Sequence, residues 1–208
     1  MSTRITNTRI CGAGETHRGK VRSSNQDLLI LEPGLGLYAV LDGMGGAKAG
    51  ERAAQVAREA IIGFVRAHGA SKRYTRRELL EFAIDAAASA VYTAGAEQVD
   101  CEGMGTTVVA CLAIEPDGIV IGHAGDSRAY LVRDGNLRAL TRDHTLVQEF
   151  IDAGSMSPEQ GEQSSIKHVL TRNLGAENGV KAEMLEQVLV PSDRLLLCSD
   201  GQIGRAHV

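Results

Sequence analysis

The chain has 208 residues, of which 43% are hydrophobic and 23% charged, a composition that predicts one globular domain with its own core. The formal net charge is −4, so neither a nucleic-acid backbone nor an anionic membrane surface is the expected partner. Only 3% of the residues are aromatic, which argues against a platform for base stacking.

The N-terminal residues and the cysteines indicate the compartment. Met1–Cys11 contains no apolar stretch of the signal-peptide kind, and no apolar run of the sequence is long enough to span a bilayer. The four cysteines have no C-x-x-C spacing, and Cys111 and Cys198 lie within apolar runs as small buried residues would. We therefore expect a cytoplasmic protein without a membrane segment, a disulfide or a zinc site.

The first half of the chain predicts two strands followed by two helices. The strands are expected at the apolar runs Leu28–Leu31 and Leu35–Leu41. A helix is expected from about Ala49 to Ala67, where apolar residues recur on one face. Thr75-Arg76-Arg77-Glu78 has the form of a capping box and predicts the start of a second helix. The buried stripe of that helix would consist of Leu80, Ile84, Ala87, Val91 and Ala94.

Strand patterns dominate the second half. Strands are expected at Thr106–Ile114, Ile119–Ala124, Arg128–Val132, Leu137–Leu140, Glu183–Val190 and Arg194–Cys198. Asp134-Gly135-Asn136 is a hairpin turn signal, and Thr145 begins a capping pattern for a short helix. Hairpin-linked strands with two adjacent helices between them predict an α+β domain with a mostly antiparallel sheet.

Three apolar runs end in an aspartate beside a glycine, at Asp42, Asp126 and Asp200. Converging carboxylates are costly to desolvate and repel one another, and a hard cation such as Mg²⁺ or Mn²⁺ relieves both costs. The alternative is that each Asp-Gly pair simply forms a turn, as we expect at Asp117-Gly118 and Asp134-Gly135. The pattern alone leaves a metal site and a set of turns equally open.

Six short motifs follow one another between residues 14 and 201. They are the segments Arg22–Asp27 (RSSNQD), Asp42–Gly46 (DGMGG), Gly103–Thr107 (GMGTT), Gly125–Tyr130 (GDSRAY), Thr141–Thr145 (TRDHT) and Ser199–Gly201 (SDG). In this order they resemble the motifs of the bacterial PPM-type, or PP2C-like, metal-dependent serine/threonine protein phosphatases. The resemblance implies a four-layer α-β-β-α sandwich with two mostly antiparallel sheets flanked by helices.

The resemblance also implies the metal ligands. Asp42 would bridge two Mn²⁺ or Mg²⁺ ions, with the Gly43 carbonyl as a further ligand. Asp200 would bind one ion of this pair. Asp126 resembles the residue that, together with Asp200, holds a third ion in bacterial members.

Other residues acquire roles around these metals. Arg22 would bind the substrate phosphate, which a guanidinium fits with two hydrogen bonds. Gln26 and Asp27 would order metal-bound water. His168 and Arg172 lie near the site in family order and are further candidates.

The implied reaction is the hydrolysis of phosphoserine and phosphothreonine in proteins. A water that has lost a proton between two cations would attack phosphorus in line, so no phospho-enzyme is required. The partners would be phosphorylated proteins and an opposing Ser/Thr kinase, and we expect a monomer. Met44 stands where some relatives carry a histidine, which would leave protonation of the leaving group to water or to another residue.

Three other functions compete with this interpretation. The first is a non-catalytic pseudophosphatase or regulatory phosphoprotein-binding module, although such a protein would usually have lost its metal aspartates. The second is a nucleotide-binding loop at the glycines between Gly43 and Gly50, whose spacing fits neither common phosphate-binding motif. The third is a serine hydrolase with Ser127 as nucleophile, although the residues that follow Ser127 look like a strand.

The chain departs from the family after Gly201. The resemblance implies a further helix, a closing strand and one more metal-binding aspartate beyond this point. Gln202–Val208 instead resembles the translation of a sequencing adapter. We therefore expect residues 1–201 to be a PPM-type domain that lacks its last strand and helix, residues 202–208 to be a non-native tail, and the chain to be weakly active.

Overall fold

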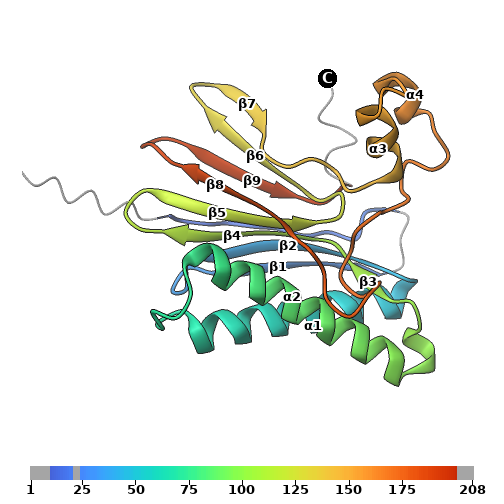
Figure 1. The fold of residues 1–208 in the computed structure, drawn as a ribbon, viewed down its shortest axis with the longest axis horizontal. Helices are drawn as coiled ribbons and strands as arrows, with labels where there is room; N and C mark the ends of the chain where they lie inside the picture. The colour runs from blue at the N-terminus through green and yellow to red at the C-terminus, as the bar shows by residue number, and fades with distance from the viewer. Residues whose placement is uncertain (1–9, 21–23, 201–208) are drawn as a thin grey trace, which may run out of the picture.

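In the computed structural model, which describes residues 10–20 and 24–200, the strands form two antiparallel sheets (Figure 1). The strands of the larger sheet are β1 (Asp27–Glu32), β2 (Leu37–Met44), β3 (Gly105–Thr106), β4 (Val108–Ile114), β5 (Gly118–Ala124) and β8 (Glu183–Val188). The smaller sheet consists of β6 (Arg128–Arg133), β7 (Asn136–Ala139) and β9 (Arg194–Cys198). The strand orders are β1-β2-β4-β5-β8, with β3 paired to β2, and β7-β6-β9. The expected α+β class with two antiparallel sheets is confirmed.

Two long helices, α1 (Ala47–His68) and α2 (Arg76–Glu97), cover one face of the larger sheet (Figure 1). The predicted capping box begins α2, because the Thr75 hydroxyl accepts from Glu78 N at 3.2 Å while the Glu78 carboxylate accepts from Thr75 N at 2.8 Å. A 3-10 turn, η1 (Val99–Cys101), follows α2. The short helices α3 (Leu146–Asp152) and α4 (Pro158–Glu162) lie beyond one end of the sheets (Figure 1). None of the described helices is both long and apolar enough to cross a membrane.

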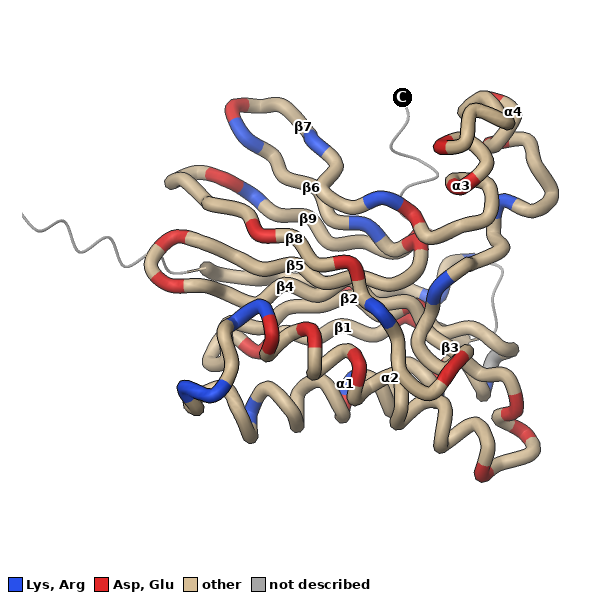
Figure 2. Tube along the Cα trace, viewed as in Figure 1, with Lys and Arg blue, Asp and Glu red and all other residues tan. Residues whose placement is uncertain are grey.

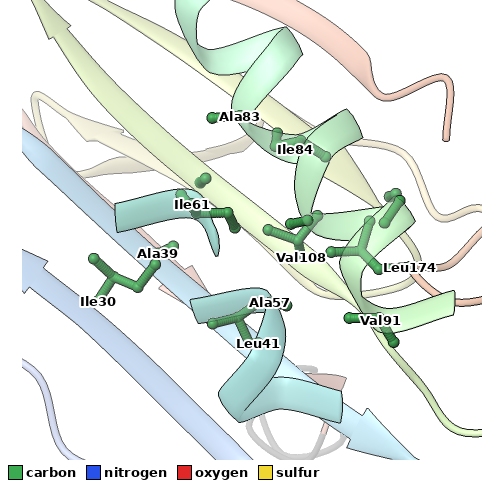
Figure 3. Packing of buried hydrophobic residues seen from close by; sticks show 14 of the residues in the cluster. Ile30, Ala39, Leu41, Ala57, Ile61, Ala83, Ile84, Val91, Val108 and Leu174 are labelled. Carbon is green, nitrogen blue, oxygen red and sulfur yellow. The ribbon is translucent and has the colours of Figure 1, made fainter. Parts of the chain in front are cut away.

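The larger sheet is buried on both faces. Alternate residues of β4 and β5 pack either against α1 and α2, as Val108 and Val120 do, or against the smaller sheet, as Val109 and Ile121 do. Figure 3 shows the helix-side cluster, in which Ile61 of α1 is fully buried. Full burial of a large apolar side chain such as Ile61 stabilises the folded state by about 1.5–3 kcal/mol. Burial on both faces explains why these strands are continuous apolar runs and do not alternate with polar residues.

Two turns lead into strands of the smaller sheet, and they differ in what they connect. Asp134 (φ 51°) and Gly135 (φ 77°) form the predicted turn between β6 and β7, both in the left-handed region that such hairpins require. The turn at Pro191-Ser192-Asp193, in contrast, does not join two paired strands. The strand before it, β8, pairs with β5 of the larger sheet, and the strand after it, β9, pairs with β6 of the smaller one. This turn therefore links the two sheets.

Candidate metal centre

Asp42 faces Asp27 directly across the β1–β2 pair. The Asp27 carboxylate accepts a hydrogen bond from the Ser199 hydroxyl at 2.9 Å through Oδ2, while its Oδ1 is buried without a partner in the described structure. Burial is the main cause that raises the pKa of Asp42 to about 8, followed by the charges of Asp27 and Asp200. Two carboxyl groups are thus held side by side with too few donors to stabilise both charges.

A second group of metal-ligating side chains converges next to this pair. Asp126, in the loop after β5, Asp200, just beyond β9, and His168 place one ligand atom each within 4.8 Å of one another. His168 Nδ1 lies 3.9 Å from Asp200 Oδ2, and both side chains are partly open to solvent. Burial, then the charges of Asp200 and Asp143, raise the pKa of Asp126 to about 6. The three aspartates that end apolar runs therefore lie close together, as a shared metal site would require.

Close backbone approach allows these loops to meet. Gly125 has φ +111°, and a Cβ at this position would lie 2.7 Å from the Thr107 side chain, so only glycine fits without strain. The Thr107 hydroxyl accepts from Asp42 N at 3.1 Å and shares a hydrogen bond of 2.7 Å with the Ser127 hydroxyl. Thr107 thereby connects the backbone of Asp42 to the residue that follows Asp126.

The Gln26 side chain lies against the loop that follows Asp42. Its Nε2 donates to Gly46 O at 2.6 Å, and Gln26 O accepts from Gly43 N at 3.2 Å. Gln26 therefore supports the backbone of this glycine-rich loop in the described structure. Arg22, the predicted phosphate-binding residue, lies outside the described residues, as does the predicted tail 202–208.

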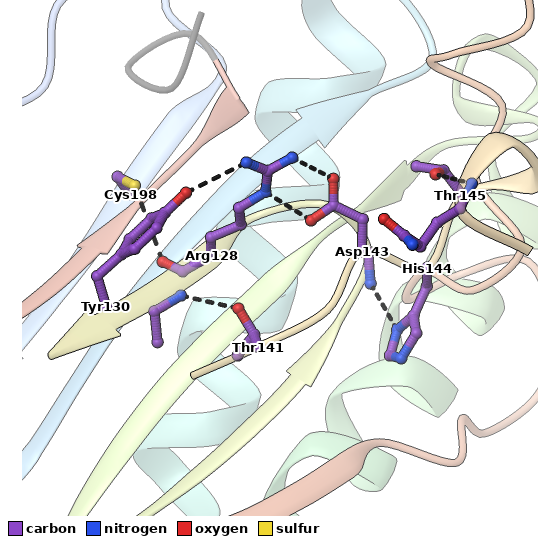
Figure 4. A network of polar contacts seen from close by, with 10 residues as sticks. Arg128, Tyr130, Thr141, Asp143, His144, Thr145 and Cys198 are labelled. Carbon is purple, nitrogen blue, oxygen red and sulfur yellow. Dashed lines mark hydrogen bonds and ion pairs between the residues drawn. The ribbon is translucent and has the colours of Figure 1, made fainter. Parts of the chain in front are cut away.

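The segment before α3 contributes groups to which the sequence assigned no role. Arg128 donates two hydrogen bonds to Asp143, from Nε at 2.6 Å and from Nη2 at 2.7 Å (Figure 4). The next residue, His144, is buried and stacks on His123, which is fully buried. Both lie near the Glu183 carboxylate, with Nε2 to Oε2 distances of 3.3 Å for His144 and 4.0 Å for His123. The motif TRDHT marked Asp143 and His144, but it did not indicate what they contact.

The described residues fit a site for divalent cations. The carboxylates of Asp42, Asp126 and Asp200 offer the oxygen ligands that Mg²⁺ and Mn²⁺ prefer. The raised pKa values of Asp42 and Asp126 and the unpartnered Asp27 Oδ1 show that positive charge is lacking. Figure 2 shows the basic residues around the start of α2 at the end of the helical layer that is remote from these carboxylates. They therefore do not supply the missing positive charge.

Comparisons with known proteins agree with this geometry. A sequence model of the family described as Protein phosphatase 2C matches residues 12–205. The serine/threonine protein phosphatase PstP of Mycobacterium tuberculosis is 35% identical over 189 residues, which are 91% of this chain and 35% of PstP. The serine/threonine phosphatase stp of Listeria monocytogenes is 34% identical over 190 residues, which are 89% of this chain and 75% of stp. The chain thus spans about a third of the length of PstP and three quarters of that of stp.

Solved structures extend the similarity to three dimensions. The catalytic domain of PstP, crystallised with two manganese ions, superposes with a TM-score of 0.76 at 36% identity. The alignment covers 90% of this chain and 76% of that domain. The two sheets and their helices are therefore shared with a protein that binds manganese.

Proposed function

We propose that this chain, which belongs to the protein phosphatase 2C family, hydrolyses phosphoserine and phosphothreonine esters in proteins by a metal-dependent reaction. The observation that carries the proposal is the convergence of Asp42, Asp126 and Asp200 from strand ends far apart in the sequence. The membership of the family and the names of the relatives support the choice of substrate.

A proposal for the metal ligands accompanies this function. We propose that Asp42 bridges two Mn²⁺ or Mg²⁺ ions, assisted by the Gly43 carbonyl and by Asp200. Asp126 and Asp200 would hold a third ion, and His168, whose ligand atom lies within 4.8 Å of theirs, is a further candidate ligand. The manganese ions in the PstP structure support this assignment. When bound, the ions supply Lewis acidity for the phosphate and for the attacking water.

The surrounding residues orient the site. Ser199 holds one oxygen of Asp27 and leaves the other free beside Asp42, where it can accept a hydrogen bond from water. Gln26 keeps the Gly43–Gly46 loop in place through Gly46 O. Arg22 would bind the phosphate oxygens with its guanidinium and offset their charge as the ester bond to the leaving oxygen lengthens.

The alternative functions receive less support. Ser127 is 1% exposed and hydrogen-bonds to Thr107, so it is not placed to attack a substrate as a serine hydrolase would require. A nucleotide-binding loop after Asp42 would bring phosphates towards several carboxylates. A non-catalytic phosphoprotein-binding module remains the second candidate, and turnover distinguishes it from an enzyme.

We also propose a setting for this activity. The substrates would be phosphorylated proteins, and the opposing enzyme a Ser/Thr kinase. All four cysteines are free, which suits the reducing cytoplasm. The three aspartates belong to one chain, which is consistent with a working monomer.

The direct test is the hydrolysis of a phosphothreonine peptide and of p-nitrophenyl phosphate with added Mn²⁺. We expect turnover that a chelator removes and that Asp42→Asn lowers by about 100-fold or more, because a bridging ligand is lost. Asp134→Asn is the matched control, since it makes the same change in the β6–β7 turn, where asparagine tolerates the positive φ. Folded protein without metal-dependent turnover would favour the binding module.

A further inference from the structure

Two buried histidines stack beside the loop that carries Asp126. The rings of His123 and His144 are 4.4 Å apart between centroids and inclined by only 7°. His123 is fully buried, and neither of its ring nitrogens has a hydrogen-bond partner within the described part of the chain. His144 is 7% exposed, and all of its polar ring atoms have neighbours.

His144 contacts Gly125 at two points. The main-chain N–H of His144 donates to Gly125 O at 3.0 Å, and the Gly125 N–H donates to His144 Nδ1 at 3.3 Å. Both polar groups of the Gly125 backbone are therefore bound by one residue, and the next residue in the chain is Asp126. Because Gly125 has φ +111°, its backbone would adopt many other conformations if it were released.

The hydrogen bonds determine the protonation of the imidazole. If Nδ1 accepts from Gly125, the ring proton lies on Nε2, which then donates to Glu183 Oε2 at 3.3 Å. Of the two neutral tautomers, only the one protonated on Nε2 satisfies the contacts with Gly125 and Glu183, and it leaves the Arg172 Nη1 donor, 3.3 Å from Nε2, without an acceptor on this ring. Burial lowers the pKa of His144, which keeps the ring neutral as this arrangement requires.

The same contacts argue against a cation bound between His123, His144 and Glu183, although their ligand atoms lie within 4.8 Å of one another. A metal ion on His144 Nε2 would require the ring proton on Nδ1, where it would meet the Gly125 N–H. The positively charged Arg172 Nη1 also lies 3.3 Å from the same Nε2. The histidine pair is better explained as support for the neighbouring loop.

We propose that His144 is a positioning residue, whose Nδ1 holds Gly125 so that the Asp126 carboxylate is presented to a metal ion next to Asp200. Glu183 fixes the ring by accepting from Nε2, and His123 supports its face. This inference rests on the proposed function, because it takes Asp126 as a metal ligand.

The test compares three substitutions that separate the two ring nitrogens. In His144→Asn the side-chain oxygen can occupy the place of Nδ1, whereas in His144→Gln the amide reaches towards the place of Nε2. His144→Phe keeps the ring and removes both nitrogens. Mn²⁺ binding to the full chain is measured by calorimetry and electron paramagnetic resonance without substrate, and urea unfolding is measured in parallel.

We expect His144→Phe and His144→Gln to weaken the Asp126-dependent Mn²⁺ by about tenfold or more, as the loss of a group that orients a ligand commonly does. His144→Asn should stay within roughly threefold of the unmodified chain, because the contact with Gly125 is retained. Asp126→Asn identifies which of the bound ions depends on Asp126.

Three results would overturn the inference. If Asp126→Asn changes Mn²⁺ binding while His144→Phe and His144→Gln do not, His144 has no positioning role and the proposed function stands. If Asp126→Asn has no effect, the metal assignment itself fails, and the inference with it. If His144→Asn loses Mn²⁺ as the other two do, in proportion to lost stability, the residue is only structural.

Discussion

Asp27 and Asp42 are direct cross-strand partners in the β1–β2 pair, and after burial the Asp27 carboxylate helps to raise the pKa of Asp42. Like charges placed opposite one another destabilise a sheet, and here they lie next to a third carboxylate, Asp200. A proton or a cation between the oxygens relieves this repulsion. Protonation and metal binding at Asp42 are therefore mutually exclusive ways to relieve the same repulsion.

This competition predicts how metal stabilises the protein at different pH values. The pKa of Asp42 is raised from 3.8 to about 8 in the folded state, so the metal-free folded chain retains a proton that the unfolded chain releases. The free energy of unfolding without metal should thus fall as the pH rises between these values. Mn²⁺ should raise Tm more at about pH 8 than at about pH 5.5, and at a hundredfold excess over its Kd the gain is about 2.7 kcal/mol.

Thermal unfolding with Mn²⁺ or with a chelator measures this effect. Asp42→Asn should reduce both the metal-induced rise in Tm and its dependence on pH, whereas Asp134→Asn in the β6–β7 turn should leave them unchanged. Equal metal-induced shifts in the Asp42→Asn variant and the unmodified chain would contradict the prediction.

The buried His123 predicts a loss of stability in acid. Burial, followed by the charge of His144, lowers the pKa of His123 from 6.5 to about 4, so the unfolded chain binds a proton that the folded chain excludes. The contribution of the neutral His123 to the free energy of unfolding is fully present above pH 6.5 and is lost as the pH falls towards 4. The loss reaches about 2 kcal/mol at pH 5. His123→Phe should remove this loss, because phenylalanine fills the site without titrating.

The measurement is the free energy of urea unfolding at about pH 7.5 and pH 5, compared between the variant and the unmodified chain so that the aspartates cancel. His68→Phe, at a partly exposed position near the end of α1, controls for the substitution itself. The idea is wrong if His123→Phe loses as much stability between the two pH values as the unmodified chain.

Ser127 should be needed for stability and not for chemistry. In Ser127→Ala the buried Thr107 hydroxyl loses one of its two hydrogen-bond partners and keeps only the one from Asp42 N, which costs about 1–3 kcal/mol. We expect phosphatase turnover to remain within roughly tenfold and a fluorophosphonate reagent to leave the unmodified chain unlabelled. Covalent labelling of Ser127, or a folded Ser127→Ala variant without turnover, would revive the serine-hydrolase alternative.

Even a conservative substitution in the Arg128–Asp143 pair should destabilise the protein. Two of the three hydrogen bonds of the guanidinium reach the Asp143 carboxylate, whose side chain is only 13% exposed, and the ammonium of lysine cannot reproduce this two-point geometry. Arg128→Lys should lower the free energy of unfolding by about 1–3 kcal/mol. Arg138→Lys, at an exposed site where the guanidinium donates to Gln187, should change it by less than about 0.5 kcal/mol. Equal effects in urea unfolding would refute the distinction.

Local sequence patterns predicted most of the helices, strands and turns, because caps and tight turns depend on interactions between residues that are close in the sequence. The capping box at Thr75 and the turn at Asp134-Gly135 depend on neighbouring residues only, and both form as expected. Pro191-Ser192-Asp193 lies between two strands that the sequence predicted, but a turn residue pattern does not say which sheet edges the two flanking strands will join. Their assignment to different sheets depends on β5 and β6, which lie far away in the sequence.

The sequence likewise predicted only part of the candidate site. Asp42, Asp126 and Asp200 were identified because each follows an apolar strand, and the structure brings them together. The grouping of His123, His144 and Glu183 was not predicted, since their spacing carries no periodic signal and Glu183 looks like an ordinary strand residue. Sequence motifs thus marked the candidate ligands but did not indicate which side chains contact the loops that carry them.

The pairing of β9 with β6 has a consequence for the order in which the protein folds. The β1–β2 hairpin joins near neighbours in the chain, so it can form early, and it carries Asp27 and Asp42. The β6–β9 ladder pairs Ala129 with Leu197, a contact of high sequence separation that closes late. Asp200 lies just beyond β9, so we expect it to join Asp27 and Asp42 only after the β1–β2 hairpin has formed. The hairpin would thus form before the charge of Asp200 adds to the repulsion between Asp27 and Asp42.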